Sequence, residues 1–117
     1  MKDYEGKIQY KGRDYRLVFN LNVMETIQEK YGSIDEWGKL TDGQNEENEP
    51  NAKAVKFGFT AMLNEGIDMD NEENGTDIKP FTEKQVGRII TEIGLKEATQ
   101  NLNDTVINSV ENTEKNA

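Results

Sequence analysis

The chain has 117 residues, of which 33% are hydrophobic and 32% are charged, and its 14 basic and 23 acidic residues give a net charge of −9. It contains no cysteine and no histidine, which excludes disulfides, thiolate and imidazole metal ligands, cysteine nucleophiles and Ser-His-Asp triads. A domain of this length buries roughly 65% of the surface of its unfolded chain, so we expect one modest core and no deep enzymatic pocket.

The negative charge is concentrated in the middle of the chain. Residues 1–31 carry 6 basic and 5 acidic groups, residues 32–81 carry 4 and 12, and residues 82–117 carry 4 and 6. Phosphate recognition needs clustered lysine and arginine, so we expect no binding to nucleic acid or to anionic membranes. No apolar run is long enough for a membrane span or a signal peptide, and a soluble cytoplasmic protein is expected.

An N-terminal β-hairpin is predicted over about residues 6–19. Ile8, Tyr10, Tyr15, Leu17 and Phe19 alternate with polar residues at period 2, with the sequence KGRD between the two runs. A four-residue loop and a two-residue loop are both compatible with this pattern, and both place these side chains on one face.

Two helices are predicted next. Asn22 followed by Glu25 resembles a helix start, and the apolar spacing after it ends at Gly32. Ser33 followed by Glu36 is a capping box that opens a second, short helix.

The acidic middle of the chain is predicted to contain one helix between two loops. Residues 41–50 have no apolar side chain and are expected to be a solvated loop. A third helix is expected from about Asn51 to Gly66, and residues 67–80 are expected to form a second acidic loop. Both loops are expected to be mobile.

The C-terminal third is predicted to be helical. Thr82 and Gln85 form a capping box before an amphipathic stripe that ends at Gly94, and a last helix covers residues 95–110. The overall expectation is an α+β, mainly helical fold, with an N-terminal hairpin and about five short helices in one domain (1–110). Residues 111–117 are expected to be a flexible tail.

No catalytic, cofactor or metal site is predicted. The acidic stretch resembles an EF-hand loop that starts at Asp70, but position 12, which needs a bidentate glutamate, falls on Phe81. Adjacent carboxylates belong to helix starts or polar loops that would not raise a catalytic pKa. No glycine-rich phosphate loop is present.

Four apolar residues are candidates for contact with a partner: Met24, Trp37, Phe57 and Met69. Trp and Met are enriched in the cores of binding patches. A role in the core is the alternative, and it is the favoured one for Trp37. Phe57 lies two residues before Phe59, about 200° away around a helix, so both cannot face the core from one side.

Read in order, the chain resembles the tail assembly chaperones of siphophages and related prophages. The resembling segments are YKGRDYRLVFNLNVMETIQEKYGSIDEW, AVKFGFTAMLNEG and PFTEKQVGRIITEIGLKEATQNLNDTVINSV. They carry a strand that leads into a helix with an aromatic-Gly end, a short capped helix, a small apolar helix, and a threonine-capped helix followed by a last amphipathic helix. Together they span roughly residues 6–110.

The resemblance implies a non-enzymatic role. Such chaperones bind the tape measure protein, keep it soluble, and leave as tail tube subunits polymerise around it. The implied partners are the tape measure protein and possibly the tail tube protein, with a homo-oligomer possible. The implied location is the host cytoplasm and not the mature virion.

Two other classes of function stay open. One is a small structural virion component, such as a head–tail connector or tail completion protein. The other is an acidic DNA mimic that inhibits a nucleic-acid enzyme. A mimic would need carboxylates spaced along helices like phosphates, whereas the sequence predicts them in loops.

Overall fold

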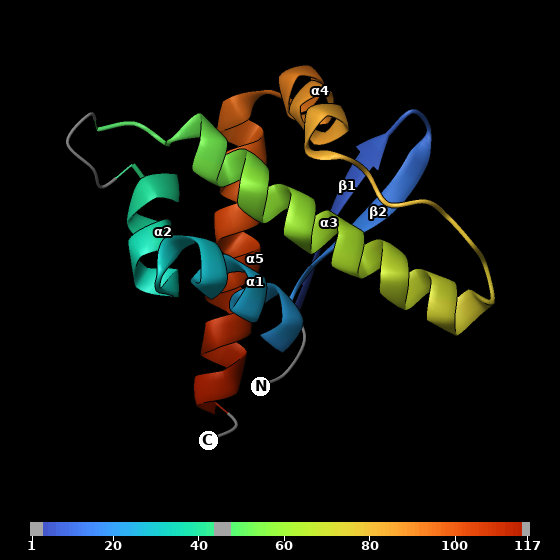
Figure 1. Cartoon of the computed structure of the whole chain (residues 1–117), viewed down its shortest axis with the longest axis horizontal. Helices are drawn as coiled ribbons and strands as arrows, with labels where there is room; N and C mark the ends of the chain where they lie inside the picture. The colour runs from blue at the N-terminus through green and yellow to red at the C-terminus, as the bar shows by residue number, and fades with distance from the viewer. Residues whose placement is uncertain (1–3, 44–47, 116–117) are drawn as a thin grey trace.

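A computed structural model describes residues 4–43 and 48–115, with the surroundings of the side chains given for 6–43 and 48–109. Within these residues the chain forms an antiparallel hairpin followed by five helices, which confirms the expected fold class (Figure 1). The elements are β1 (Tyr4–Tyr10), β2 (Arg13–Phe19), α1 (Leu21–Tyr31), α2 (Ile34–Thr41), α3 (Ala52–Asn74), α4 (Glu83–Ile93) and α5 (Leu95–Lys115).

The hairpin closes through the two-residue loop. Lys11 and Gly12 both have positive φ, 51° and 75°, which is the backbone of a type I′ turn. Tyr10 therefore pairs with Arg13, and Ile8 pairs with Tyr15. The predicted face is retained, because both loop lengths preserve the alternation of side chains.

The first two helices begin at polar caps, one of which was misplaced by two residues. The Asn20 side chain, and not that of Asn22, accepts the N-terminal hydrogen bond of α1, from the Val23 N–H at 3.2 Å. Helix α2 starts as predicted, because the Ser33 hydroxyl accepts from the Glu36 N–H at 3.0 Å. It continues to Thr41, and residues 44–47 of the expected first loop lie outside the described residues.

Helix α3 corrects the largest error of the sequence prediction. It does not end at Gly66 but continues to Asn74, where Gly75 adopts a left-handed conformation. A Cβ at Gly66 would overlap the carbonyl oxygen of Arg16, so this glycine permits close packing on β2 and does not end the helix. The expected second loop therefore begins at residue 75 instead of 67.

Contacts with the hairpin hold the added turns of α3 in place. The Arg16 guanidinium lies 2.7 Å from the Asp70 carboxylate and 3.3 Å from that of Glu73. Ile67 is buried in the same stretch. Acidic residues that look like a solvated loop in the sequence are helical because one buried side chain and one arginine dock them.

The last two helices follow the prediction closely. Thr82 and Gln85 form both hydrogen bonds of a capping box, and Gly94 separates α4 from α5 with φ 103°. Helix α5 runs to Lys115, so residues 111–115 of the expected tail are helical, whereas 116–117 lie outside the described residues. The mobility of this tail stays a prediction.

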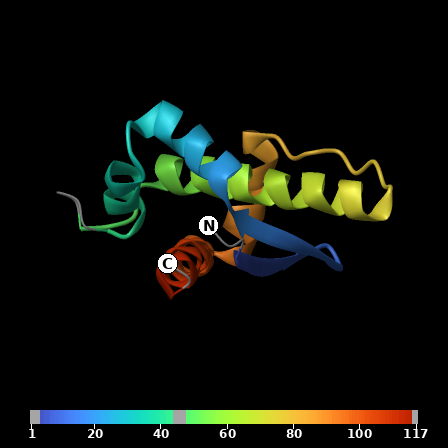
Figure 2. The same ribbon diagram turned by 90° about the horizontal axis from the view of Figure 1, so that it is seen from below.

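The core lies where α3 crosses the hairpin. Helix α3 packs along β2 and α5 packs against β1, and these two helices also contact each other (Figure 2). Helices α1 and α2 cover the N-terminal half of α3, and α4 lies across it from the other side (Figure 1). Among the described residues, no helix is long and apolar enough to cross a membrane.

We expect Gly58→Ala to destabilise the fold. A Cβ at Gly58 would overlap ring carbons of the rigid, buried Trp37 indole, and overpacking of this kind costs about 1–3 kcal/mol. Gly87→Ala is the matched control, because its Cβ would meet only the flexible Lys56 side chain, at 3.5 Å. The control should gain up to about 1 kcal/mol from helix propensity. Thermal melts of both variants test this, and equal shifts would contradict it.

The Arg16 contact should control the stability of the last turns of α3. We expect Asp70→Ala to speed amide hydrogen exchange across residues 67–74 by about tenfold, since hydrogen bonds to charged groups contribute about 1.5–3 kcal/mol. Glu72→Ala removes the same charge from an exposed position with no ion pair among the described residues. Exchange that responds equally to both changes would show that Arg16 does not hold this segment.

Candidate interaction surface

Trp37 belongs to the core. Its side chain is 1% exposed, and its Nε1 donates a hydrogen bond to the Ala54 carbonyl at 3.0 Å. The ring lies against Gly58 of α3. A role in the core, which the sequence favoured for Trp37, is therefore the one observed. Trp37 is not available at the surface of the folded protein.

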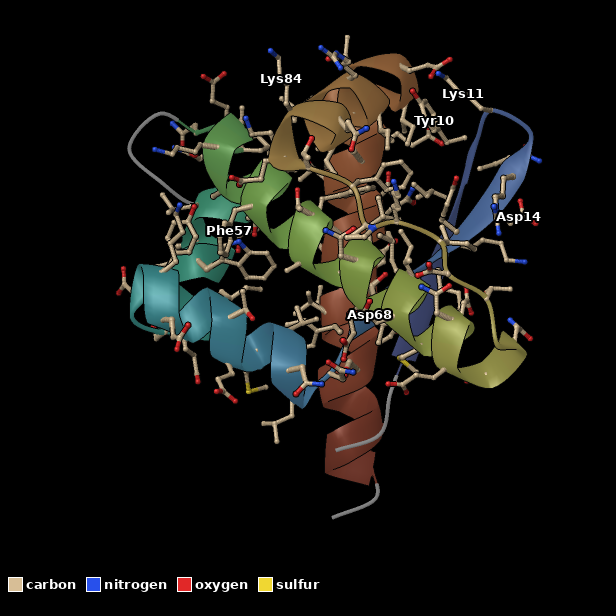
Figure 3. The ribbon with its side chains drawn as sticks, turned by 45° about the vertical axis from the view of Figure 1, so that its right-hand side comes forward. Tyr10, Lys11, Asp14, Phe57, Asp68 and Lys84 are labelled. Atoms are coloured by element: carbon tan, nitrogen blue, oxygen red, sulfur yellow. The ribbon has the colours of Figure 1, made fainter. Side chains whose placement is uncertain are left out.

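Phe57 lies at the side of α3 that faces α1 (Figure 3). Its ring meets the Tyr31 ring edge to face, with the centroids 5.6 Å apart. The Lys30 ammonium lies 4.7 Å from the Phe57 centroid, which is within the range of a cation–π contact. Phe57 thus lies off the side of α3 on which Phe59 is buried, meets another element, and remains half-buried.

The hydroxyl of Tyr31 stays neutral in this setting. Burial raises the pKa of Tyr31 above its ordinary value, and the negative charge of Glu83 raises it further. An uncharged phenol suits an aromatic pair, because a phenolate would have to be desolvated beside a carboxylate. We call Lys30, Tyr31 and Phe57 the aromatic cluster.

The other two predicted residues lie apart from this cluster. Met24 is half-buried on α1, and at about 100° per residue it lies on the flank of the helix opposite Asn22 and Thr26. Those two residues line a shallow groove against α3 of about 220 Å³. Met69 is half-buried near the end of α3, about 18 Å along the helix axis from Phe57. The structure does not bring the four candidates together.

The groove between α1 and α3 is lined by both polar and apolar side chains. Its lining residues are Asn22, Val23, Thr26, Ala61, Asn64, Glu65 and Asp68. The Glu65 carboxylate accepts hydrogen bonds from the side chains of Asn20 at 2.6 Å and Asn22 at 2.9 Å. This network fixes α1 on α3, so the groove forms a polar floor beside the aromatic cluster.

Three large apolar side chains among the described residues are exposed and were not among the sequence candidates. Leu21 is 66% exposed, Ile107 is 53% exposed and Leu95 is 40% exposed. Leu95 was expected to begin the last helix, and it does so. As the first residue of α5, Leu95 lies at the edge of the contacts that this helix makes with its neighbours. A periodic pattern of apolar residues does not reveal where such contacts end.

The acidic side chains in the described part of the chain do not gather into a metal site. No group of three or more acidic side chains within that part could hold a metal ion. Asp70, the first position of the EF-hand-like pattern, is paired with Arg16. Its neighbours up to Asn74 are helical, whereas a calcium loop must wrap around the ion.

We therefore expect no saturable calcium binding in the micromolar range. Calorimetric titration of the intact protein with calcium, and separately with magnesium, measures this. The physical reason is that binding would have to unwind the last turn of α3 and break the pair of Arg16 with Asp70. A dissociation constant of about 10 μM or tighter, as sensor-type sites reach, would contradict the expectation.

Comparisons of the chain with protein-family models, with curated proteins and with solved structures found no match.

Proposed function

We propose that the protein is a non-enzymatic tail assembly chaperone that binds the tape measure protein and keeps it soluble during assembly of the tail tube. The proposal is supported by the resemblance across residues 6–110. It is also supported by the order of the elements in that span, namely hairpin, helix, short helix, apolar helix, capped helix and final helix.

The aromatic cluster is the observation that carries the proposal. Phe57 and Tyr31 form a half-buried aromatic pair, and the Lys30 ammonium lies over the Phe57 ring. Lysine is flexible and can bury its stem while its ammonium stays in water. A partner helix with an apolar stripe could displace Lys30 and bury the ring, as in helix-in-groove recognition.

The charge of the chain suits this task. A tape measure protein is long and helical, and its apolar stripes would associate if left exposed. A bound protein with a net charge of −9 adds repulsion between complexes and so favours solubility. The chaperone would act in the host cytoplasm and leave as tail tube proteins assemble, so it would be absent from the mature virion.

One observation gives the DNA-mimic alternative more support than the sequence alone gave it. The five acidic residues between positions 65 and 73 lie on helix α3 and not in a loop. Asp70 and Glu73, however, share the positive charge of Arg16. The row of carboxylates is therefore interrupted, which keeps the mimic as the second candidate.

Phe57→Ala is the direct test of the proposal. We expect the variant to fold, with a loss of about 1–2 kcal/mol because the ring is half-buried and paired. We also expect it to lose most of its capture of co-expressed tape measure protein, since a buried aromatic anchor contributes about 2 kcal/mol or more to binding. Melting temperature and pull-down are measured in parallel, with Met24→Ala tested in the same way.

Ile107→Ala is the control, because it truncates an exposed apolar residue outside the aromatic cluster. Its capture should equal that of the unchanged protein. Undiminished capture by both Phe57→Ala and Met24→Ala would place the interface elsewhere. Capture of no tape measure protein by the unchanged chain, with incorporation into purified virions, would favour the structural-component alternative.

A further inference from the structure

A groove of about 340 Å³ lies between the hairpin tip and α4, away from the aromatic cluster. Its lining residues are Tyr10, Lys11, Arg13, Tyr15, Phe81, Gln85, Arg88 and Ile89. Tyr10 and Lys11 lie at the tip of the hairpin, and Phe57 lies on the other side of the molecule (Figure 3). We call this feature the tip groove.

Aromatic rings form the apolar part of the tip groove. Tyr15 and Phe81 meet edge to face with their centroids 5.3 Å apart. This contact joins β2 to the segment before α4, which fixes the two sides of the groove relative to each other. Tyr10, Tyr15 and Phe81 are all half-buried, so part of each ring is open to a ligand.

Three cations surround the rings. The Lys11 ammonium lies 5.4 Å from the Tyr10 centroid, and the Arg13 guanidinium carbon lies 5.8 Å from that of Tyr15. Arg88 enters from α4. No aspartate or glutamate lines the groove. Among the residues that the structure describes, none of these three cations forms an ion pair with a carboxylate.

The tip groove is a positive region on an acidic chain, which has 23 acidic residues against 14 basic ones. Three cations that line one groove, with no carboxylate among its lining residues, create a local positive field. Combined with open aromatic surface, this field selects a ligand that is both anionic and apolar.

We propose that the tip groove binds a short acidic peptide segment of a partner protein. One apolar side chain of the segment would pack on the rings of Tyr10, Tyr15 and Phe81, and its carboxylates would pair with the surrounding cations. Arginine is well suited to this role because its guanidinium can hold a carboxylate through two hydrogen bonds. The tip groove is distinct from the aromatic cluster, and its role does not depend on the proposed function.

Negative charge next to the tip groove favours a short peptide over single-stranded nucleic acid as the ligand. Both kinds of ligand can bind to aromatic rings and cations. A neighbouring groove shares Tyr10 and Lys11 but is also lined by Glu92 and Glu97. A phosphate backbone that continued past the hairpin tip would meet these carboxylates. A segment with two or three carboxylates ends before it reaches them.

The probe is a synthetic pentapeptide of alternating glutamate and phenylalanine, acetylated and amidated. Titration into the intact protein should give saturable shifts of amide NMR resonances in the hairpin tip and α4. Arg88→Glu should weaken binding about tenfold or more, because it replaces a charge-assisted contact by repulsion. Lys11→Glu, in the exposed turn, is the second variant if Arg88→Glu does not fold.

Lys53→Glu is the matched control. It makes the same change in net charge on the first turn of α3, at a residue that does not line the tip groove. Its affinity for the pentapeptide should stay within about twofold of the unchanged protein. An equal loss in Arg88→Glu and Lys53→Glu would show only a net-charge effect and overturn the proposal.

Three further results would also overturn it. The first is equal binding of a pentapeptide with lysine in place of glutamate. The second is preferential binding of single-stranded oligothymidine at the tip groove. The third is a change of oligomeric state in Arg88→Glu by analytical ultracentrifugation, which would identify a second copy of the chain as the occupant. Binding of the glutamate peptide alone, lost in Arg88→Glu and kept in Lys53→Glu, supports the proposal.

Discussion

The close approach of helix α3 to its neighbours is the constraint on which the rest of the structure depends. Two glycines permit it, Gly58 against the Trp37 ring and Gly66 against the Arg16 carbonyl. Eight residues separate them, so they face directions about 80° apart around the helix. One helix can therefore pack tightly on α2 along one flank and on β2 along another, and the small core is built around it.

The same packing decides which parts of the hairpin stay available. Helix α3 lies along β2 and shields it, as natural proteins do with exposed strand edges. The hairpin tip extends beyond α3, and Tyr15 of β2 contacts Phe81 in the segment before α4. The tip groove is thus a consequence of the architecture, because the tip is fixed on one side and open on the other.

Local sequence signals predicted most of the elements, because they report local physics. The hairpin, the Ser33 cap and the Thr82–Gln85 capping box depend on residues close together in the chain. The end of α3 could not be predicted in this way, since a glycine before acidic residues has the pattern of a helix end. What keeps the helix intact is Arg16, 54 residues before Asp70.

The surfaces were harder to predict than the fold for a related reason. The separation between Phe57 and Phe59 showed that one ring must leave the core-facing side, but the identity of its neighbours, Lys30 and Tyr31, is set by tertiary packing. The tip groove was hidden altogether, because Lys11 and Arg88 come from opposite ends of the sequence. Charges summed over long segments are close to neutral at both ends and conceal a cluster that forms only on folding.

The local field of that cluster need not be cancelled by the net charge of −9. At physiological ionic strength the Debye length is about 8 Å, so exposed carboxylates farther away act weakly on a ligand in the tip groove. The cations that touch the ligand act at full contact distance and are less screened. Salt therefore reduces the long-range repulsion between this chain and an acidic segment more than it reduces the contacts inside the groove. An acidic protein can in this way repel other copies of itself in solution and still hold an acidic segment at one place on its surface.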